Sequence, residues 1–273
     1  MESGPYIKNK NLWQKIHRSP LFDISQFILL VGAILWFFVN SSEQMGYNWQ
    51  WYQIPRYIFT HDEAGYYAGP LWDGLMVTFR ISGISLLLAF IIGLATALFR
   101  LSNSFAARII ARVYLEAIRN TPLLIQLFFI YFVLGPVLGI SRMASAILAL
   151  SLFEGAYASE IFRAGIDSIR RGQWEAAYSL GLNSFDTYYC VILPQAIRRI
   201  LPPLTSQAIS LIKDSALVST IAIYDLTMQA QAVIAETFLT FELWFTVAGM
   251  YLAVTVTLSF IVNWMENHFK VVT

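Results

Sequence analysis

Apolar residues along this chain are concentrated in long blocks, and shorter segments rich in polar and charged residues separate them. A helix that crosses a bilayer needs about 20 predominantly apolar residues. Six blocks approach or exceed that length: 21–40, 72–99, 122–140, 143–162, 204–224 and 243–264. The pattern predicts an all-α integral membrane protein with about six transmembrane helices.

The polar segments between these blocks carry their basic residues on one side. With the N-terminus inside, the outer segments hold only Arg56 and Arg142, and two further basic residues, Arg80 and Lys213, lie within spans. The inner segments hold fourteen: Lys8, Lys10, Lys15, Arg18, Arg100, Arg108, Arg112, Arg119, Arg163, Arg170, Arg171, Arg198, Arg199 and Lys270. Because basic residues favour the cytoplasmic side, we expect both termini in the cytoplasm.

The spans divide the chain into regions. We expect a cytoplasmic segment at 1–20, an extra N-terminal transmembrane helix at 21–40, a periplasmic segment at 41–71, a five-helix transmembrane domain at 72–264 and a cytoplasmic C-terminus at 265–273. The first span is alternatively a cleaved signal peptide, but its long leader and long apolar run favour retention. The Tyr- and Trp-rich outer segment suits an interfacial helix.

The largest inner segment, about 163–203, is predicted to fold as two helices rather than as a loose connection. Four of its residues share one helical face: Trp174, Ala177, Tyr178 and Gly181. Gly181 is expected to end the first helix, and Asn183 and Ser184 are good N-cap residues for a short second one. Pro194 is expected to close the unit.

Charged residues inside the spans are the next candidates, because a charge in hydrocarbon is costly unless it is paired or faces water. Arg80 and Glu154 are expected within one or two helical turns of each other in depth. They suit the carboxylate and ammonium of an amino acid, or they form an ion pair with each other; both interpretations stay open. Lys213 and Asp214 are neighbours that point about 100° apart, and packing is favoured over binding for them.

Two further sets of polar residues suggest contacts within or between helices. Glu160 and Arg163 have the spacing of a local ion pair on one helix. Ser210, Ser215 and Ser219 have nearly helical spacing and suit small polar contacts between membrane helices.

Several motifs together resemble the permease subunits of bacterial ATP-binding-cassette importers, in the branch that transports polar amino acids. Glu175-Ala176-Ala177, Gly181 and Val191-x-Leu193-Pro194 are similar to the EAA loop of that family, although Val191 stands where isoleucine is usual. Other similar stretches occur in the same order along the chain: 117–128, 155–169, 171–181 and 209–226. The family often has a small or polar residue where Glu154 stands.

The resemblance implies an importer in the bacterial cytoplasmic (inner) membrane with the type I fold and several partners. Because the chain lacks a G-x-x-x-x-G-K-[ST] motif, separate ATPase subunits would bind ATP and Mg, and this chain would need no cofactor. A second permease subunit, identical or homologous, and a periplasmic or lipid-anchored binding protein are also implied.

Candidate site residues fall into two sets: the resemblance supplies those for ATPase coupling, and the charged and polar residues of the spans supply those for the substrate path. Those for ATPase coupling are Glu175, Ala176, Ala177, Gly181, Asn183, Ser184, Leu193 and Pro194. Those for the substrate path are Arg80, Glu154, Tyr157, Gln126, Lys213 and Asp214. For Glu175 alone, an alternative is a carboxylate in the first turn of a helix, stabilised by the helix dipole.

Other function classes fit the sequence less well. The formal net charge of +1 gives no reason to expect a nucleic-acid partner, and the single Cys190 excludes a cysteine-rich metal site. A membrane enzyme would need a clustered set of acid, base or metal-ligating residues, whereas the three histidines, His17, His61 and His268, are scattered. An ion-coupled secondary transporter, the main alternative, often shows two similar halves, and no internal repeat is visible here.

Overall fold

The computed structural model describes residues 20–44, 46–62 and 65–269. By their internal contacts they divide into two units, with the boundary after Gln50. The described part of the first unit contains one helix, α2 (Pro20–Gln44), whose apolar stretch Phe22–Ile34 is shorter than a membrane span. A span at 21–40 therefore stays a prediction. The basic residues at 8, 10, 15, 18 and 270 lie outside the described residues.

The second unit opens with an irregular segment and not with the single interfacial helix that was predicted for 41–71. It contains η1 (Trp51–Gln53), α3 (Pro55–Ile58) and an antiparallel hairpin of β1 (Phe59–Asp62) and β2 (Gly65–Ala68). Pro55 is tolerated in the first turn of a helix, which fits the start of α3. Gly65 has φ +130°, which only glycine adopts readily, and this position supports the hairpin turn.

The remaining chain is helical. The long helices are α4 (Pro70–Leu101), α5 (Phe105–Arg119), α8 (Arg142–Asp167), α11 (Leu193–Asp214) and α13 (Thr240–Phe269). The shorter elements are α6 (Leu123–Phe128), η2 (Phe129–Leu134), α7 (Gly135–Leu138), α9 (Arg171–Ser179), α10 (Ser184–Asp186), η3 (Thr187–Ile192), η4 (Ser215–Ile221) and α12 (Leu226–Thr237).

Three of the described helices are long and apolar enough to cross a membrane: α4, α8 and the 240–264 part of α13. Two bent pairs raise the number to five when each counts as one span. These are α5 with 123–138, bent by 107°, and 184–221 with α12, bent by 47°. The helical membrane fold is confirmed, and the small hairpin is its one described departure from all-α structure.

Two predicted spans are parts of longer helical segments. The span at 122–140 is the second half of a bent pair whose first half, α5, is amphipathic, and the bend falls where Pro122 restricts the preceding residue. The helix that contains the predicted span at 204–224 begins well before residue 204, because α11 starts at Leu193 and carries Arg198 and Arg199 beyond the apolar block. Apolar runs alone miss such polar continuations of a helix.

Close packing of small residues joins α4 to α8. A Cβ built on Gly93 would lie 2.8 Å from Cβ of Ala158 and 3.0 Å from the carbonyl oxygen of Gly155. Small residues at such contacts let two membrane helices approach closely. This contact fixes the pair of helices on which Arg80, Glu154 and Glu160 lie.

The core consists of three apolar clusters. One contains Ile81, Leu127, Leu150, Leu211 and Val218 and joins α4, α6, α8, α11 and η4. A second gathers Ile54, Leu71, Leu226 and Leu243 around the N-terminal end of α4. The third gathers Phe162, Ile192 and Ile200 beside the α9–α10 segment.

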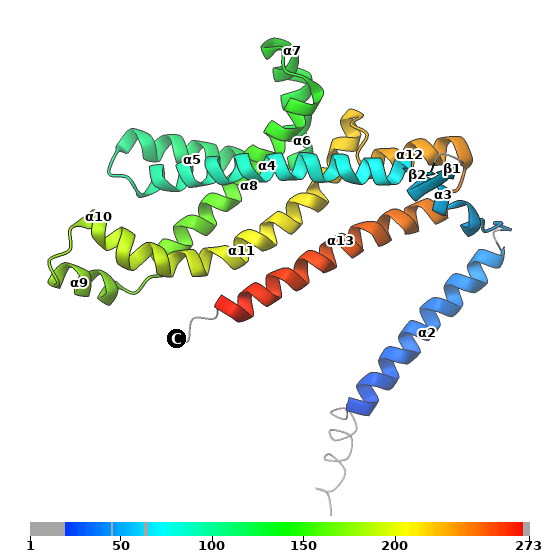
Figure 1. The fold of residues 1–273 in the computed structure, drawn as a ribbon, viewed down its shortest axis with the longest axis horizontal. Coiled ribbons are helices and arrows are strands. Elements are labelled where there is room, and N and C mark those ends of the chain that lie inside the picture. The colour runs from blue at the N-terminus through cyan, green and yellow to red at the C-terminus, as the bar shows by residue number, and fades with distance from the viewer. Residues whose placement is uncertain (1–19, 45, 63–64, 270–273) are drawn as a thin grey trace, which may run out of the picture. The chain divides into compact units, whose positions relative to one another are not determined.

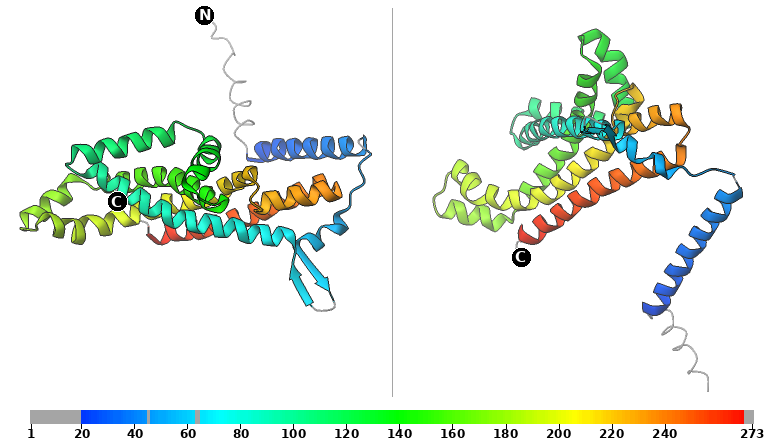
Figure 2. Two further views of the ribbon diagram at one scale, coloured as in Figure 1. Left: turned by 90° about the horizontal axis from the view of Figure 1, so that it is seen from above. Right: turned by 45° about the vertical axis from the view of Figure 1, so that its right-hand side comes forward.

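Within the second unit, α9 and α10 lie at one end, whereas α12, α3 and the hairpin lie at the other (Figure 1). The view from above shows the same separation and shows α5 turning back beside α4 (Figure 2, left). The predicted inner segment with α9 and α10 and the predicted outer segments with the hairpin and α12 therefore lie at opposite ends of this unit (Figure 1).

Candidate functional site

The segment between α8 and α11 carries the predicted coupling residues. Glu175 is the fifth residue of α9, and its side chain is exposed, with no ion pair or hydrogen bond to another described residue. It lies beyond the first turn, so the helix-dipole interpretation of this carboxylate is wrong. Ala176 is exposed beside it, whereas Ala177 is buried and anchors α9 to the protein.

Gly181 ends α9, as the sequence predicted. Its φ is +78°, a left-handed conformation that L side chains rarely adopt. The Gly181 N–H donates to the Tyr178 carbonyl at 3.0 Å, and the Leu182 N–H donates to the Ala177 carbonyl at 3.2 Å. These bonds satisfy the last carbonyls of the helix in the manner of a glycine C-cap.

The second helix begins as predicted but does not end as predicted. The Asn183 side chain accepts a hydrogen bond of 2.9 Å from the Asp186 N–H and caps α10, whose first residue is Ser184. Leu193 and Pro194 do not close the unit, because they are the first two residues of α11 in one helical run from α10 onward.

The same segment exposes large apolar side chains that the sequence reading had not singled out. Leu180 is 82% exposed, Phe185 is 75% exposed, and the Phe185 and Tyr189 rings are stacked at 3° with centroids 6.1 Å apart. Exposed apolar groups that gather in this way commonly mark a protein interface. Their concentration around the glycine turn was visible in the sequence and could have indicated this surface.

Glu154 is the most deeply buried of the predicted substrate-path residues. It lies on α8, is 1% exposed, and accepts a hydrogen bond of 2.7 Å at Oε2 from Nε2 of Gln207 on α11. Its Oε1 has no hydrogen-bond partner in the described part of the chain. Gln207 was not among the predicted site residues, although an amide in an apolar helix is also a signal of a polar contact.

Glu154 and Gln207 line a cavity of about 220 Å³ between α4, α8 and α11. Its other lining is almost entirely apolar and includes Leu87, Phe90 and Leu204. A carboxyl group beside an apolar cavity, with one oxygen unpaired, is costly unless a proton or a cationic group completes it. The arrangement can therefore hold an ammonium group.

Arg80 does not pair with Glu154. Its side chain is exposed on α4 and forms no ion pair with the described residues. Arg80 lies seven residues, or about two turns, before Leu87, so the two share one face of α4. The interpretation of Arg80 and Glu154 as a sealing ion pair finds no such contact within this chain.

Two other substrate-path candidates, Gln126 and Tyr157, contact residues that are close to them in the chain. Gln126 is buried and donates from Nε2 to the Ile118 carbonyl at 2.7 Å and the Thr121 carbonyl at 3.0 Å, which secures the bend between α5 and α6. Tyr157 packs its ring against Phe153 with centroids 5.0 Å apart. Neither lines the Glu154 cavity.

The Lys213–Asp214 pair marks the end of α11, where the helix tightens into η4. Lys213 is exposed and Asp214 is half-buried. Ser215 and Ser219 are buried, but their hydroxyls donate to carbonyls of their own helical run at 2.8 Å and 2.7 Å. These bonds do not cross to another helix, so the two serines aid packing through their small size.

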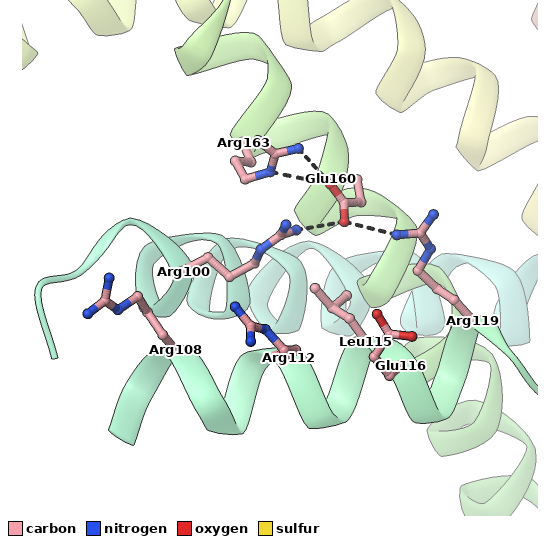
Figure 3. Close-up of a pocket in the computed structure, with 8 residues that line it drawn as sticks. All are labelled: Arg100, Arg108, Arg112, Leu115, Glu116, Arg119, Glu160 and Arg163. Carbon is pink, nitrogen blue, oxygen red and sulfur yellow. Dashed lines mark hydrogen bonds and ion pairs between the residues drawn. The ribbon is translucent and has the colours of Figure 1, made fainter. Parts of the chain in front are cut away.

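Glu160 forms the predicted pair with Arg163, at 3.2 Å, but it is also the centre of a larger network. Its Oε1 lies 2.6 Å from Nη1 of Arg100 on α4 and 3.0 Å from Nη1 of Arg119 on α5. Figure 3 shows the three guanidinium groups converging on this one carboxylate. Glu160 thereby joins α4, α5 and α8, a tertiary arrangement that its spacing to Arg163 could not indicate.

Curated relatives cover most of the chain. It is 39% identical over 204 residues to the glutamine transport system permease protein GlnP of Escherichia coli strain K12, covering 74% of this chain and 93% of that protein. It is 44% identical over 165 residues to the L-cystine transport system permease protein TcyB of Bacillus subtilis, covering 60% of this chain and 70% of that protein.

Solved structures have the same fold. The crystal structure of an amino acid ABC transporter with histidines contains a chain that is 36% identical, with a TM-score of 0.70 over 73% of this chain and 94% of that one. An inward-facing structure of the MetNI methionine ABC transporter matches in fold at 19% identity, with a TM-score of 0.62 over 74% of this chain and 96% of that one.

The family model for binding-protein-dependent transport system inner membrane components matches residues 89–271, which include the coupling segment and Glu154. The predicted ABC permease nature is confirmed, and an ion-coupled secondary transporter is excluded. The chain belongs to this family of inner-membrane permease subunits, in which ATP hydrolysis lies on a separate subunit.

Proposed function

We propose that this permease imports polar amino acids and that the ammonium group of the substrate meets Glu154 on its path. The observation that carries the proposal is the buried carboxylate, with one oxygen hydrogen-bonded to Gln207 and the other without a partner, beside the cavity between α4, α8 and α11. The glutamine and L-cystine permeases named above support amino acids as the substrate class.

Arg80 has a place on the same route. A guanidinium group within a membrane helix must face water or another polar group, and the exposed Arg80 shares its face of α4 with Leu87 at the cavity. Arg80 lies nearer the predicted outer end of α4 than Leu87 does. An amino-acid carboxylate would therefore meet Arg80 before its ammonium group reaches Glu154.

The partners follow from the same proposal. The family name implies a binding protein, and the similarity to ABC transporter structures supports an ATPase partner. We place the ATPase on the α9–α10 segment, where Glu175 is unpaired and Leu180 and Phe185 are exposed. A second permease subunit, identical or homologous, completes the translocation path, and a periplasmic or lipid-anchored binding protein delivers the substrate from the end that carries α12 and the hairpin. Both termini face the cytoplasm, where the ATPase binds ATP and Mg.

The test is uptake by proteoliposomes that contain the permease with its co-purified ATPase and binding protein. Radiolabelled glutamine, histidine, arginine and cystine are compared in the wild type and in Glu154→Gln. The variant should lose more than about tenfold in uptake of the preferred substrate, since removing one partner of a desolvated charge pair costs about 2–5 kcal/mol.

Two controls make the result specific. Asp23→Asn removes an exposed carboxylate from α2, outside the proposed substrate path and docking surfaces, and should leave uptake unchanged. Inserted protein and basal ATPase activity are measured in each sample, so that misfolding is distinguished from a loss of substrate binding. Full uptake by Glu154→Gln would contradict the role of Glu154, and the absence of ATP-dependent uptake of any amino acid would contradict the substrate class.

A further inference from the structure

A pocket distinct from the substrate path lies between the C-terminal end of α4, the length of α5 and the last turns of α8. Its volume is about 340 Å³. Eight residues line it: Arg100, Arg108, Arg112, Leu115, Glu116, Arg119, Glu160 and Arg163. Five arginines thus face two glutamates, and the pocket carries an excess of positive charge even when Asp167, which pairs with Arg163 beside it, is included.

The two acids do not neutralise the whole pocket. Glu160 is shared among Arg100, Arg119 and Arg163. The Glu116 carboxylate accepts a hydrogen bond of 2.8 Å from Nδ2 of Asn120. The side chains of Arg108 and Arg112 form no ion pair or hydrogen bond with any described residue.

Arg108 and Arg112 are four residues apart on α5, and both project from the side of the helix that faces Arg100 (Figure 3). Like charges at this spacing destabilise a helix. An anion between them would remove that repulsion. The planar guanidinium fork matches phosphate oxygens in particular, because it donates two parallel hydrogen bonds.

The neighbouring face of α5 is apolar, and it is not covered by the described part of the chain. Phe105 is 73% exposed, and Ile109 and Val113 are exposed as well. Ile109 follows Arg108 by one residue and so lies about 100° around the helix from it. A basic face beside an apolar face is typical of a helix at the membrane surface, where the headgroups meet the acyl chains.

We propose that this pocket binds the phosphate group of an acidic phospholipid, with the acyl chains along Phe105, Ile109 and Val113. The unpaired arginines would bind the negatively charged phosphate, and the apolar face would contact the acyl chains. A soluble phosphate would use only the first feature. The arginine-rich ends of α4 and α5 lie on the side where basic residues predominate, which is also where basic pockets between membrane helices meet anionic headgroups.

The experiment measures lipid binding directly by native mass spectrometry. The full chain is purified in detergent with the subunits that remain attached, and it is titrated with phosphatidylglycerol or with phosphatidylcholine. We expect a clear preference for phosphatidylglycerol in the wild type. Arg108→Gln with Arg112→Gln should lower the affinity for phosphatidylglycerol by about thirtyfold, from the usual contribution of two basic side chains near an anionic surface, and should leave phosphatidylcholine binding unchanged.

Two matched variants test whether the pocket, and not the overall charge, is responsible. Arg170→Gln with Arg171→Gln removes the same charge from exposed positions at the start of α9, and the preference should survive. Glu116→Gln removes an acid from the pocket wall and should strengthen phosphatidylglycerol binding. The side chains changed are exposed, so folding should persist, and thermal unfolding of each variant checks this.

Three results would overturn the proposal. The first is equal binding of the two lipids by the wild type. The second is an equal loss in both double variants, which would indicate an unspecific effect of charge. The third is displacement of phosphatidylglycerol from the wild type by millimolar inorganic phosphate, while the arginine double variant still binds phosphatidylglycerol more weakly than the wild type. That combination would indicate an arginine-dependent site for small phosphate anions.

Discussion

Gln207 on α11 donates a hydrogen bond of 2.7 Å from Nε2 to Oε2 of Glu154 on α8. This bond links two helices through a carboxyl group that is 1% exposed and leaves its other oxygen without a partner among the described residues. The pair therefore has a structural component, which holds α8 to α11, and a free acceptor that is available to a ligand.

Gln207→Leu should destabilise the protein by about 1–3 kcal/mol, because it leaves both oxygens of the buried Glu154 without a donor. Thermal unfolding of the purified chain in detergent measures the change. Gln231→Leu, at an exposed position of α12, is the control and should have little effect. Equal midpoints for the two variants would show that the bond contributes nothing to stability.

Arg80→Gln and Glu154→Gln should each reduce uptake, and the double variant should not recover it. The two side chains form no ion pair within this chain, so removing one does not leave the other with a lost partner. Effects at sites without shared contacts usually add. Uptake normalised to inserted protein is compared in the single variants and the double variant, and rescue in the double variant would demonstrate that Arg80 and Glu154 do pair.

Arg80→Lys should also impair uptake, because lysine lacks the bidentate fork.

Glu175→Lys and Gly181→Leu should leave the chain inserted but weaken its association with the ATPase and abolish coupled uptake. The first reverses an exposed charge on α9. The second forces a leucine into φ +78°, which costs about 1–2 kcal/mol and disturbs the turn that orients α10. Co-purification of the ATPase and uptake are the measurements. Asp23→Lys, on α2, is the charge-matched control, and an equal effect there would argue against the α9–α10 segment as the docking surface.

Gly93→Leu should destabilise the protein by about 1–3 kcal/mol through overpacking. Its Cβ would lie within 3.0 Å of the Gly155 carbonyl oxygen, a backbone atom that cannot move aside without shifting α8. Gly83→Leu is the control on the same helix, since a Cβ there meets no atom within 4 Å. The unfolding midpoints of the two variants should differ, and the same midpoint for both would mean that the α4–α8 contact is not tight.

Reporter fusions after Asn103 and Leu182 should report the cytoplasm, and fusions after Tyr224 and Phe238 should report the periplasm. The first two sites follow α4 and α9, and the last two flank α12, which lies at the opposite end of the unit from α9 (Figure 1). The distribution of basic residues gives the direction. The opposite signal at all four sites would invert the orientation proposed for the membrane domain.

The sequence by itself determined the class of the protein. Long apolar blocks can bury their backbone polar groups in lipid only as helices, so 72–99 and 143–162 predicted α4 and α8 from composition alone. The glycine at position 181 likewise predicted the end of α9, because the left-handed conformation strongly favours that residue. Local chemistry was sufficient in each case.

Only the tertiary structure decided which polar side chains meet. Arg80 and Glu154 have complementary charges and similar depth, but the direction of a side chain around its helix depends on how the helices pack. Gln207, 53 residues away from Glu154 in the chain, became its partner because the packing of α8 on α11 brings those two faces together. The same holds for Glu160, which collects arginines from α4 and α5 that lie 60 and 41 residues away in sequence. Spacing along one helix indicates neighbours on that helix, whereas contacts between helices are fixed by the fit of the whole bundle.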